Sequence, residues 1–312
     1  MTNQIALHPH DTPAQQLGLA FIGLGAMGEP MCRCLVVASD DLEVTVYDIA
    51  AERIAGLVEA GARAAGSPAE ASRDAGIVVL AVRDREQLNS SVFGEHGVMS
   101  TLRPGATIIL TSTVGPDVVR DTARRLAERD IALLDAPVSG GPGRAATGDL
   151  LVMVGAPDDV VARCRPVLDR IASTVAHVGQ RPGDGQAMKA VNQLLCGVHV
   201  AAAAEAVALA RGLGLDPQVA LDVLGQGAAA SFMFADRGPR MIPVDGWTGP
   251  VRSRLDIFVK DMGIVTQVAR GAHVPTPVAS AAEQLYLLGE RAGLGARDDS
   301  AVVTLLSPPA SS

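Results

Sequence analysis

The chain has 312 residues, which is long enough for two domains of ordinary size. Apolar residues other than Gly make up 48% of the sequence, and this proportion excludes intrinsic disorder for the bulk of the chain. The 26 basic and 34 acidic residues give a formal net charge of −8, and no basic run is present that would neutralise nucleic-acid phosphates. We therefore expect no nucleic-acid partner.

The cysteines and the N-terminal residues indicate the compartment. None of the four cysteines lies in a CxxC pair or beside a His at metal-ligand spacing, so the sequence predicts neither a bound metal nor a disulfide framework. Residues 1–17 lack the features of a secretory signal or a transit peptide, and we expect a disordered tail there. The longest apolar stretch, 194–210, contains His199 and Glu205 and predicts a buried helix rather than a membrane span. These features favour a cytoplasmic protein without membrane association.

From Leu19 to about Val178, short apolar segments alternate with amphipathic ones. The apolar segments are rich in β-branched residues and bounded by Gly, Pro and Asp, which is typical of buried strands at 19–23, 43–48, 77–82, 107–112, 131–138 and 150–155. The amphipathic segments predict helices near 27–38, 51–60, 116–129 and 157–170. Apolar strands separated by helices imply right-handed crossovers, so we expect an α/β fold with a Rossmann-type, doubly wound and mostly parallel sheet.

The remainder of the chain has a helical pattern. The segment RPGDG at 181–185 interrupts the chain, and a long helical pattern follows to about Leu213. Further helices are expected at 216–225, 231–238, 255–270 and 275–292. The sequence therefore predicts a Rossmann-type α/β domain over residues 18–180 and an all-α domain over residues 181–312.

A glycine-rich turn follows the first predicted strand. Its six residues, which form a GxGxxG motif, are Gly23, Leu24, Gly25, Ala26, Met27 and Gly28. The first glycine permits a tight turn, the second admits a pyrophosphate to the backbone, and the third allows close packing of helix and sheet. Glycine-rich turns also serve plain packing, but the strand before this one and an acid at Asp48, 20 residues after Gly28, are typical of dinucleotide binding.

Asp48 also predicts which dinucleotide is bound. A carboxylate at the end of the second strand holds the ribose hydroxyls and repels a 2′-phosphate, and no Arg immediately follows it. We therefore expect NAD rather than NADP. The alternative is that Asp48 merely caps the next helix.

Two later segments indicate an acid substrate and a base. The tip Ser139-Gly140-Gly141 presents a hydroxyl and two unhindered amides, which suit a carboxylate, although an ordinary glycine turn has the same residues. Lys189 lies in the first turns of the long helix, with Asn192 and Gln193 one turn further on. The positive end of the helix dipole lowers the pKa of an ammonium group, as a neutral catalytic base requires. The alternative is a solvated surface lysine.

Four blocks of the sequence, in this order, resemble the β-hydroxyacid dehydrogenases, a family that includes 3-hydroxyisobutyrate dehydrogenase and tartronate semialdehyde reductase. The blocks are GLGAMGEPM (23–31), DAPVSGGPGRAATG (135–148), GDGQAMKAVNQ (183–193) and VKDMGIV (259–265). The resemblance covers nearly the whole chain from Leu19 to about Leu306. It implies the Rossmann fold and the helical domain that the apolar pattern predicts.

The resemblance also implies roles for individual residues. Cofactor contacts are implied for the glycine-rich turn, for Ser112 and Thr113 after the fifth strand, and for Lys260 from the helical domain. Substrate binding is implied for Ser139, Gly140 and Gly141, and Lys189 resembles the catalytic lysine. Many members carry Asn four residues after this lysine, whereas this chain has Gln193 there and Asn192 at three. Either amide is therefore a candidate for substrate contact.

A finer resemblance, at 192–210, 231–237, 255–263 and 298–302, is to the L-threonate dehydrogenase branch of the family. It implies NAD-dependent oxidation of a small hydroxy acid, L-threonate to its 2-oxo acid, with Lys189 as general base. The charged residues Asp236, Arg237, Arg254 and Asp256 in candidate pocket segments favour a substrate with extra hydroxyls. The helix over about 184–213 is apolar on more than one face, so we expect a homodimer or homotetramer, as the resemblance also implies.

Three alternatives stay open. The first is the activity of 3-hydroxyisobutyrate dehydrogenase or tartronate semialdehyde reductase. The second is a non-catalytic Rossmann protein that senses NAD. The third is a reductase of imines or glyoxylate that uses NADPH. Lys189 and Asp48 both count against the third, because such members usually replace the lysine or lack the acid.

Overall fold

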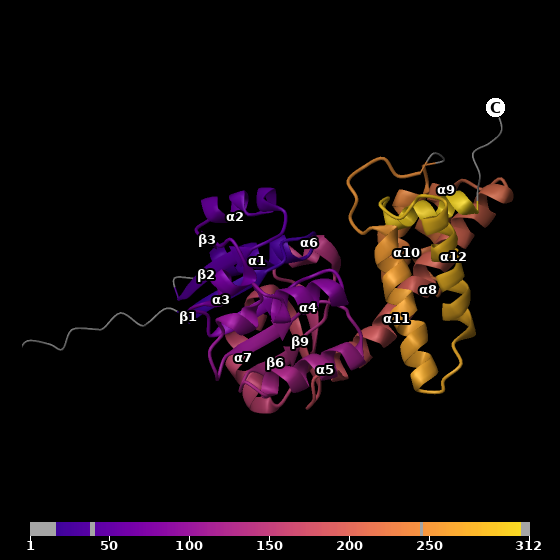
Figure 1. Ribbon diagram of the computed structural model, residues 1–312. Coiled ribbons are helices and arrows are strands. Elements are labelled where there is room, and N and C mark those ends of the chain that lie inside the picture. The colour runs from indigo at the N-terminus through magenta and orange to yellow at the C-terminus, as the bar shows by residue number, and fades with distance from the viewer. Residues whose placement is uncertain (1–16, 38–40, 244–245, 307–312) are drawn as a thin grey trace, which may run out of the picture.

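The structure is a computed structural model that describes residues 17–37, 41–243 and 246–306. It has an α/β domain followed by a helical domain, and the long helix α8 (Asp184–Gly212) runs from the first into the second (Figure 1). The predicted fold class is therefore confirmed. Residues 1–16 of the expected tail lie outside the described part of the chain, and Leu17 begins the first strand.

The sheet of the α/β domain has nine strands within the described residues, in the order β3-β2-β1-β4-β5-β6-β8-β7, with β9 paired to β8. The strands from β3 to β6 along this order are parallel, whereas β8 is antiparallel to β6 and β7 and parallel to β9. The strands are β1 (Leu17–Ile22), β2 (Leu42–Tyr47), β3 (Arg63–Ala64), β4 (Ile77–Leu80), β5 (Thr107–Leu110), β6 (Ala132–Asp135), β7 (Val138–Ser139), β8 (Leu150–Gly155) and β9 (Ala172–Gly179).

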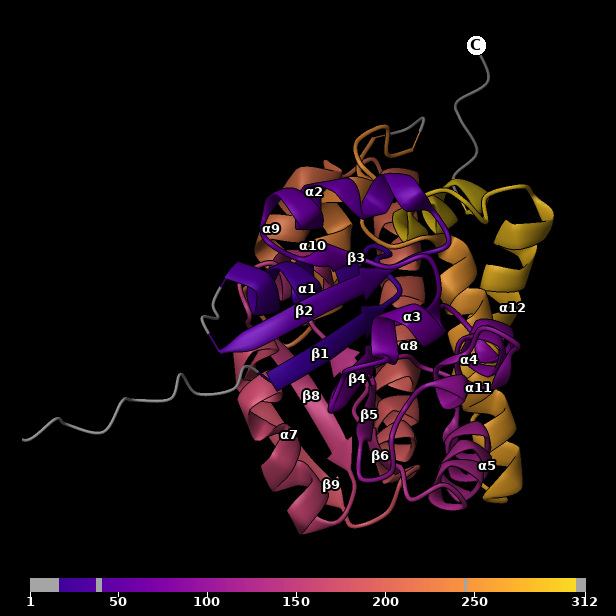
Figure 2. The ribbon, with the colours of Figure 1, turned by 60° about the vertical axis from the view of Figure 1, so that its left-hand side comes forward.

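Helices cover both faces of this sheet (Figure 2). Alternate side chains of each central strand point to opposite faces, so that Phe21 belongs to the apolar cluster with α1 and α7 while Ile22 belongs to the cluster with α4 and α5. The helical segments of this domain are α1 (Gly28–Val37), η1 (Ala51–Arg53), α2 (Ala55–Glu59), α3 (Pro68–Ser72), α4 (Arg85–Phe93), η2 (Val98–Ser100), α5 (Pro116–Ala127), α6 (Gly141–Ala145) and α7 (Asp158–Ile171).

The helical domain packs around the C-terminal half of α8. A third apolar cluster joins α8, α10, α11 and α12, and within it the rings of Phe258 and Tyr286 stack with centroids 5.1 Å apart. After α8 the helical segments are α9 (Pro217–Leu224), α10 (Phe232–Met241), α11 (Leu255–Gly271), α12 (Pro277–Arg291) and η3 (Asp299–Leu305). Because one continuous helix contributes to both domains, residues in its first turns sit at the domain boundary.

Some elements differ from the sequence expectation. The expected strand 131–138 is split into β6 and β7, because Pro137 has no N–H to donate to a sheet. The polar helix α4 and the strand β9 were not expected. Both carry many exposed polar side chains, and an edge strand or a polar helix has little apolar periodicity to reveal it.

Candidate active site

The glycine-rich turn lies at the carboxyl end of β1, which has β2 on one side and β4 on the other. Open sheets of this type bind ligands where the strand order reverses. Gly23 has φ +96°, and a Cβ on Gly28 would collide with the carbonyl oxygen of Gly23, so both positions require glycine. A Cβ on Gly25 would instead meet no described atom within 4 Å. The space beside Gly25 is therefore open, as contact between a pyrophosphate and the start of α1 requires.

Asp48 is buried and holds the glycine-rich turn in place. Its Oδ2 accepts a hydrogen bond from the amide of Leu24 at 2.5 Å, and its Oδ1 accepts one from the amide of Ala50 at 2.8 Å. The Arg53 guanidinium, on η1, lies 3.3 Å from the same Oδ1. The acid thus lies at the end of β2 beside the glycine-rich turn and stabilises that turn. Arg53 is a neighbouring cation outside the predicted site residues.

The loop after β5 meets the helical domain. Lys260, on α11, donates a hydrogen bond to the carbonyl oxygen of Thr113 at 2.7 Å. Next to it, the hydroxyl of Ser112 is buried and has no hydrogen-bond partner within the described residues. A buried hydroxyl without a partner is unfavourable unless a ligand satisfies it. Ser112, Thr113 and Lys260 are therefore brought together, and they fit the cofactor contacts that were predicted for them.

The predicted substrate residues and the lysine also come together. Ser139 ends β7, and Gly140 and Gly141 follow with positive φ angles of 142° and 77°. The Nζ of Lys189 donates a hydrogen bond to the carbonyl oxygen of Val138 at 2.8 Å, next to Ser139. This contact places the amine of a buried lysine beside the backbone that was predicted to hold a carboxylate.

The two candidate amides have different contacts. The hydroxyl of Ser139 lies 3.4 Å from the Oδ1 of Asn192, whose Nδ2 donates to the Oε1 of Gln193 at 2.8 Å. The Nε2 of Gln193 donates in turn to the Oδ2 of Asp261 at 2.5 Å, and the Oδ1 of Asp261 lies 2.8 Å from the Nζ of Lys260. Polar contacts therefore run from the predicted substrate residues to the predicted cofactor residues. Asn192 is the amide at the Ser139 end of this series.

The surroundings of Lys189 lower its pKa below the usual value for lysine. Burial of the side chain is the main cause, and the positive charge of Lys260 acts in the same direction. The negative charge of Asp261 and the thiol of Cys196 act in the opposite direction. A lysine with a lowered pKa is neutral over more of the working pH range, which is the state in which it accepts a proton.

The site also contains three buried polar residues that were not among the predicted site residues. Asp261 follows Lys260 directly, and it contacts Gln193 as described above. Gln186, one turn before Lys189, hydrogen bonds to the loop after β5, and Asp135, at the end of β6, hydrogen bonds to Gln186. Each lies within or next to a block that carries a predicted site residue, but a polar residue there has no pattern that reveals its distant partners.

The charged residues expected to face substrate hydroxyls are instead paired with one another. Arg237 contacts Asp236 at 2.7 Å and the buried Asp299 at 3.0 Å. Asp256 accepts from Arg254 at 2.5 Å and from Arg83 of the α/β domain at 2.9 Å. These contacts hold α10 to η3 and link the two domains. They therefore give no support to the use of these side chains in substrate recognition.

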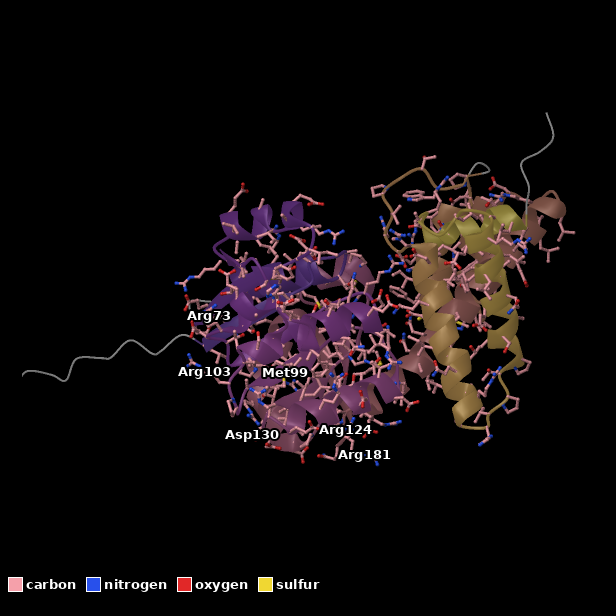
Figure 3. All side chains as sticks on the ribbon, in the orientation of Figure 1. Arg73, Met99, Arg103, Arg124, Asp130 and Arg181 are labelled. Carbon is pink, nitrogen blue, oxygen red and sulfur yellow. The ribbon has the colours of Figure 1, made fainter. Side chains whose placement is uncertain are left out.

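A cavity of about 320 Å³ adjoins the loop after β5, between the first turns of α4 and α5 and the side of α11. It is lined by Thr113, Val114, Lys260 and Ile264, together with three acids in the first two turns of these helices or at their start, Asp84, Asp117 and Asp121. Figure 3 shows that side chains from both domains enter the gap between the two ribbons, and that the labelled Arg124 and Arg181 lie at the lower edge of the α/β domain. The cavity is contiguous with the predicted cofactor residues and belongs to the same site.

Two further features bear on ligands and environment. Among the described residues, no three His, Cys, Asp or Glu side chains form a group that would hold a metal ion.

By length and composition alone, α8 is the one helix in the described ranges apolar enough to cross a membrane, with a mean hydropathy of 1.6. The core helix of a globular protein has the same properties, and 44% of the relevant stretch of α8 is buried within the protein.

Comparisons with known proteins identify the family of this chain. Residues 18–179 match the NAD binding domain of 6-phosphogluconate dehydrogenase, and residues 183–306 match the NAD-binding family of NADP-dependent 3-hydroxyisobutyrate dehydrogenase. The L-threonate dehydrogenase of Cupriavidus necator is 39% identical over 92% of this chain and 95% of its own length. The 3-hydroxyisobutyrate dehydrogenase of Pseudomonas aeruginosa is 34% identical over 88% of this chain and 92% of its own. A crystal structure of 3-hydroxyisobutyrate dehydrogenase from Salmonella typhimurium, 36% identical, has a TM-score of 0.85 and covers 93% of this chain and 100% of that one.

The fold and the site together define an oxidoreductase that uses a nicotinamide dinucleotide, NAD or NADP. The chain belongs to the 3-hydroxyisobutyrate dehydrogenase-like family, as its sequence blocks predicted. Its relatives are named as dehydrogenases of small hydroxy acids. This protein is accordingly a hydroxyacid dehydrogenase.

Proposed function

We propose that this enzyme oxidises L-threonate to its 2-oxo acid with NAD, and that Lys189 is the general base. The observation that carries the proposal of a base is the position of the Lys189 amine, buried, 2.8 Å from the carbonyl oxygen of Val138 and beside Ser139. The substrate is proposed from the 39% identity to an L-threonate dehydrogenase over nearly the whole of both chains.

The residues of the site suit the steps of such an oxidation. The hydroxyl of Ser139 and the amides of Gly140 and Gly141 bind the substrate carboxylate. The neutral amine of Lys189 takes the proton of the hydroxyl that is oxidised, and the carboxylate of Asp261 stabilises the ammonium group that results. Asn192 orients the reacting hydroxyl, since it lies beside Ser139. When bound, the nicotinamide ring supplies the hydride acceptor.

The preference for NAD rests on Asp48. Its buried carboxylate lies at the end of β2, where the adenosine ribose of a Rossmann cofactor binds, and a negative charge there repels a 2′-phosphate. Arg53 lies close enough to attract such a phosphate, but it is already paired with Asp48. The proposed order of affinity is therefore NAD above NADP.

The experiment that tests the substrate is a comparison of kcat/KM for L-threonate, other four-carbon sugar acids and 3-hydroxyisobutyrate, each with NAD and with NADP. A site that hydrogen bonds a substrate hydroxyl rejects an analogue without it by up to roughly 10⁴-fold. We therefore expect a far higher kcat/KM for L-threonate than for 3-hydroxyisobutyrate. Equal values, or the reverse order, would move the assignment to the 3-hydroxyisobutyrate dehydrogenase branch and would leave the family unchanged.

We also propose that the enzyme is a homodimer or homotetramer in the cytoplasm, with the small hydroxy acid as its substrate and neither nucleic acid nor membrane as a partner. Support for an oligomer comes from apolar side chains exposed at the end of α8 and along α9, such as Leu209, Val219 and Val223. Support for the cytoplasm comes from the four cysteines, all of which are free thiols. Fractionation of cells that produce the protein tests the location.

A further inference from the structure

We infer that Gln186 is a positioning residue of this dehydrogenase, which fixes the loop after β5 for cofactor binding against the helix turn that carries Lys189. The inference rests on the proposed function, because it assigns a role within the same site. It goes beyond that function in naming the side chain that sets the distance between the cofactor residues and the base.

The side chain of Gln186 is 1% exposed and uses all of its hydrogen-bonding capacity. Its Oε1 accepts from the amides of Val114 and Gly115, both at 3.0 Å. Its Nε2 donates to the carbonyl oxygen of Ser112 at 3.0 Å and to the Oδ1 of Asp135 at 2.9 Å. Three of these four bonds end on the backbone of the loop 112–115, so the amide determines the conformation of that loop.

Asp135 sets the orientation of the Gln186 amide. Its Oδ2 accepts from the backbone amides of Gly183 and Gln186, both at 2.9 Å, and its Oδ1 accepts from the Gln186 side chain. Burial raises the pKa of Asp135 to about 6, against the opposing effect of these hydrogen bonds. The group is thus a carboxylate at neutral pH and can only accept. The NH₂ of Gln186 therefore faces Asp135, and its oxygen faces the loop.

The start of α8 is packed directly on the sheet at this point. A Cβ on Gly185 would lie 2.6 Å from the carbonyl oxygen of Met153 and 2.9 Å from that of Asp135, so only glycine permits this approach. Lys189 follows Gln186 by one turn of the same helix, and its amine reaches Val138. A rigid helix turn consequently connects the loop that Gln186 holds with the base.

The loop that Gln186 holds carries the features expected of a cofactor contact. The buried hydroxyl of Ser112 has no partner among the described residues, and the carbonyl of Thr113 accepts from Lys260. If the loop moved, the hydroxyl of Ser112 would move relative to Lys189, and the contact between Thr113 and Lys260 would be lost. Loss of the Gln186 amide should therefore weaken cofactor binding and turnover, while the predicted substrate residues Ser139, Gly140 and Gly141, which the Gln186 side chain does not contact, keep their positions.

The test compares two variants with a structural control. Gln186→Met keeps the approximate volume and removes the four side-chain bonds, and Gln186→Glu keeps the acceptor for Val114 and Gly115 but replaces the donor. Ser72→Ala removes buried hydrogen bonds of α3, remote from the site, and is the control. The measurements are the Kd of NADH by fluorescence, kcat, the KM of the hydroxy acid and the Tm.

For both Gln186 variants, well below their Tm, we expect the NADH Kd to rise and kcat to fall by about tenfold or more, because Gln186→Glu loses the two hydrogen bonds of the NH₂ group and Gln186→Met loses all four. The KM of the hydroxy acid should stay within about twofold. Ser72→Ala should lower the Tm without changing the NADH Kd. The inference is overturned if a folded Gln186 variant binds NADH like the wild type, or if its only change is a lower Tm.

The exchanged pair Asp135→Asn with Gln186→Glu covers the case in which Gln186→Met does not fold. In this double variant an amide at 135 donates to a carboxylate at 186, which still accepts from Val114 and Gly115. We expect it to bind NADH more tightly than Gln186→Glu alone. No recovery in a folded double variant contradicts the inference. Because NADH binding is measured without substrate, a failure of the threonate proposal leaves this result interpretable.

Discussion

The amine of Lys189 and the carbonyl oxygen of Val138 lie 2.8 Å apart, and this contact joins the first turns of α8 to the strand that leads into Ser139. It holds the lysine beside Ser139, where we propose that the substrate carboxylate binds. The sequence contains two lysines, Lys189 and Lys260, and both lie in this site, whereas all other basic side chains except the histidines are arginines. Lysine loses its proton far more readily than arginine. Both side chains of this chain that can act as amine bases therefore lie in this site.

The first prediction concerns Lys189→Ala. The variant should bind NADH with nearly the affinity of the wild type and lose turnover by roughly 10²–10⁴-fold, the usual effect of removing a general base. The matched control is Lys260→Ala, which removes the contact with Thr113 and should raise the NADH Kd instead. Steady-state kinetics and NADH titration measure both. Turnover of Lys189→Ala within tenfold of the wild type would remove Lys189 from the mechanism.

The second prediction is the pH dependence of hydroxy-acid oxidation. The neutral amine is the active form, so kcat/KM should rise with pH through the pKa of Lys189, which burial places below the lysine value of 10.5. Asp261 raises this pKa by its negative charge. Asp261→Asn should therefore move the rising limb to lower pH. A limb that stays in place would show that a different group titrates.

The same pKa is measurable without turnover. With carbon-13 in its lysines the protein should give two lysine side-chain signals in an NMR spectrum, because the sequence has two lysines. Lys260→Arg identifies the signal of Lys189. We expect the Lys189 signal to titrate below the range of a solvated lysine. Titration at the ordinary value would contradict the role of burial.

The third prediction concerns Asp48→Asn. The substitution removes the negative charge that holds the ribose hydroxyls and repels a 2′-phosphate, so NAD should bind about tenfold more weakly and discrimination against NADP should decrease. Arg53→Ala is the companion variant, because Arg53 is the cation next to Asp48. It should change NAD affinity little. If the wild type prefers NADP and Arg53→Ala abolishes that preference, Arg53 rather than Asp48 determines the cofactor.

Much of this candidate site could be predicted from the sequence because its residues lie in short motifs, and each motif indicates a structure through residues that are close together in the chain. The GxGxxG motif requires a strand and a helix on either side, and both are present as β1 and α1. Lys189 was selected because the start of a helix is an unfavourable place for a positive charge, and the structure adds burial, which has the same effect on its pKa.

The remaining parts of the site depend on contacts between distant residues. Gln186 is 72 residues from Val114, and Gln193 is 68 residues from Asp261. Neither residue type indicates its partner, because Gln and Asp are also common on solvated helix surfaces. The charged residues of α10 were misleading for the same reason. Arg237 pairs with Asp299, 62 residues away, and the sequence offered no sign of this pair.

The last prediction is an oligomer that involves the end of α8 and the helix α9. Five apolar side chains at the end of α8, in its connection to α9 and on α9 are more than half exposed: Leu209, Leu213, Leu215, Val219 and Val223. Several exposed apolar side chains within so short a segment are typical of a protein interface, and we expect a second copy of the chain to cover them. Light scattering at micromolar concentration should show the mass of a dimer or tetramer. The double variant Leu213→Glu with Val223→Glu should have a lower mass in the same measurement, because the charges destabilise the interface. Val58→Glu, at an exposed position on α2 of the other domain, should leave it unchanged. A monomeric wild type at that concentration would disprove the prediction.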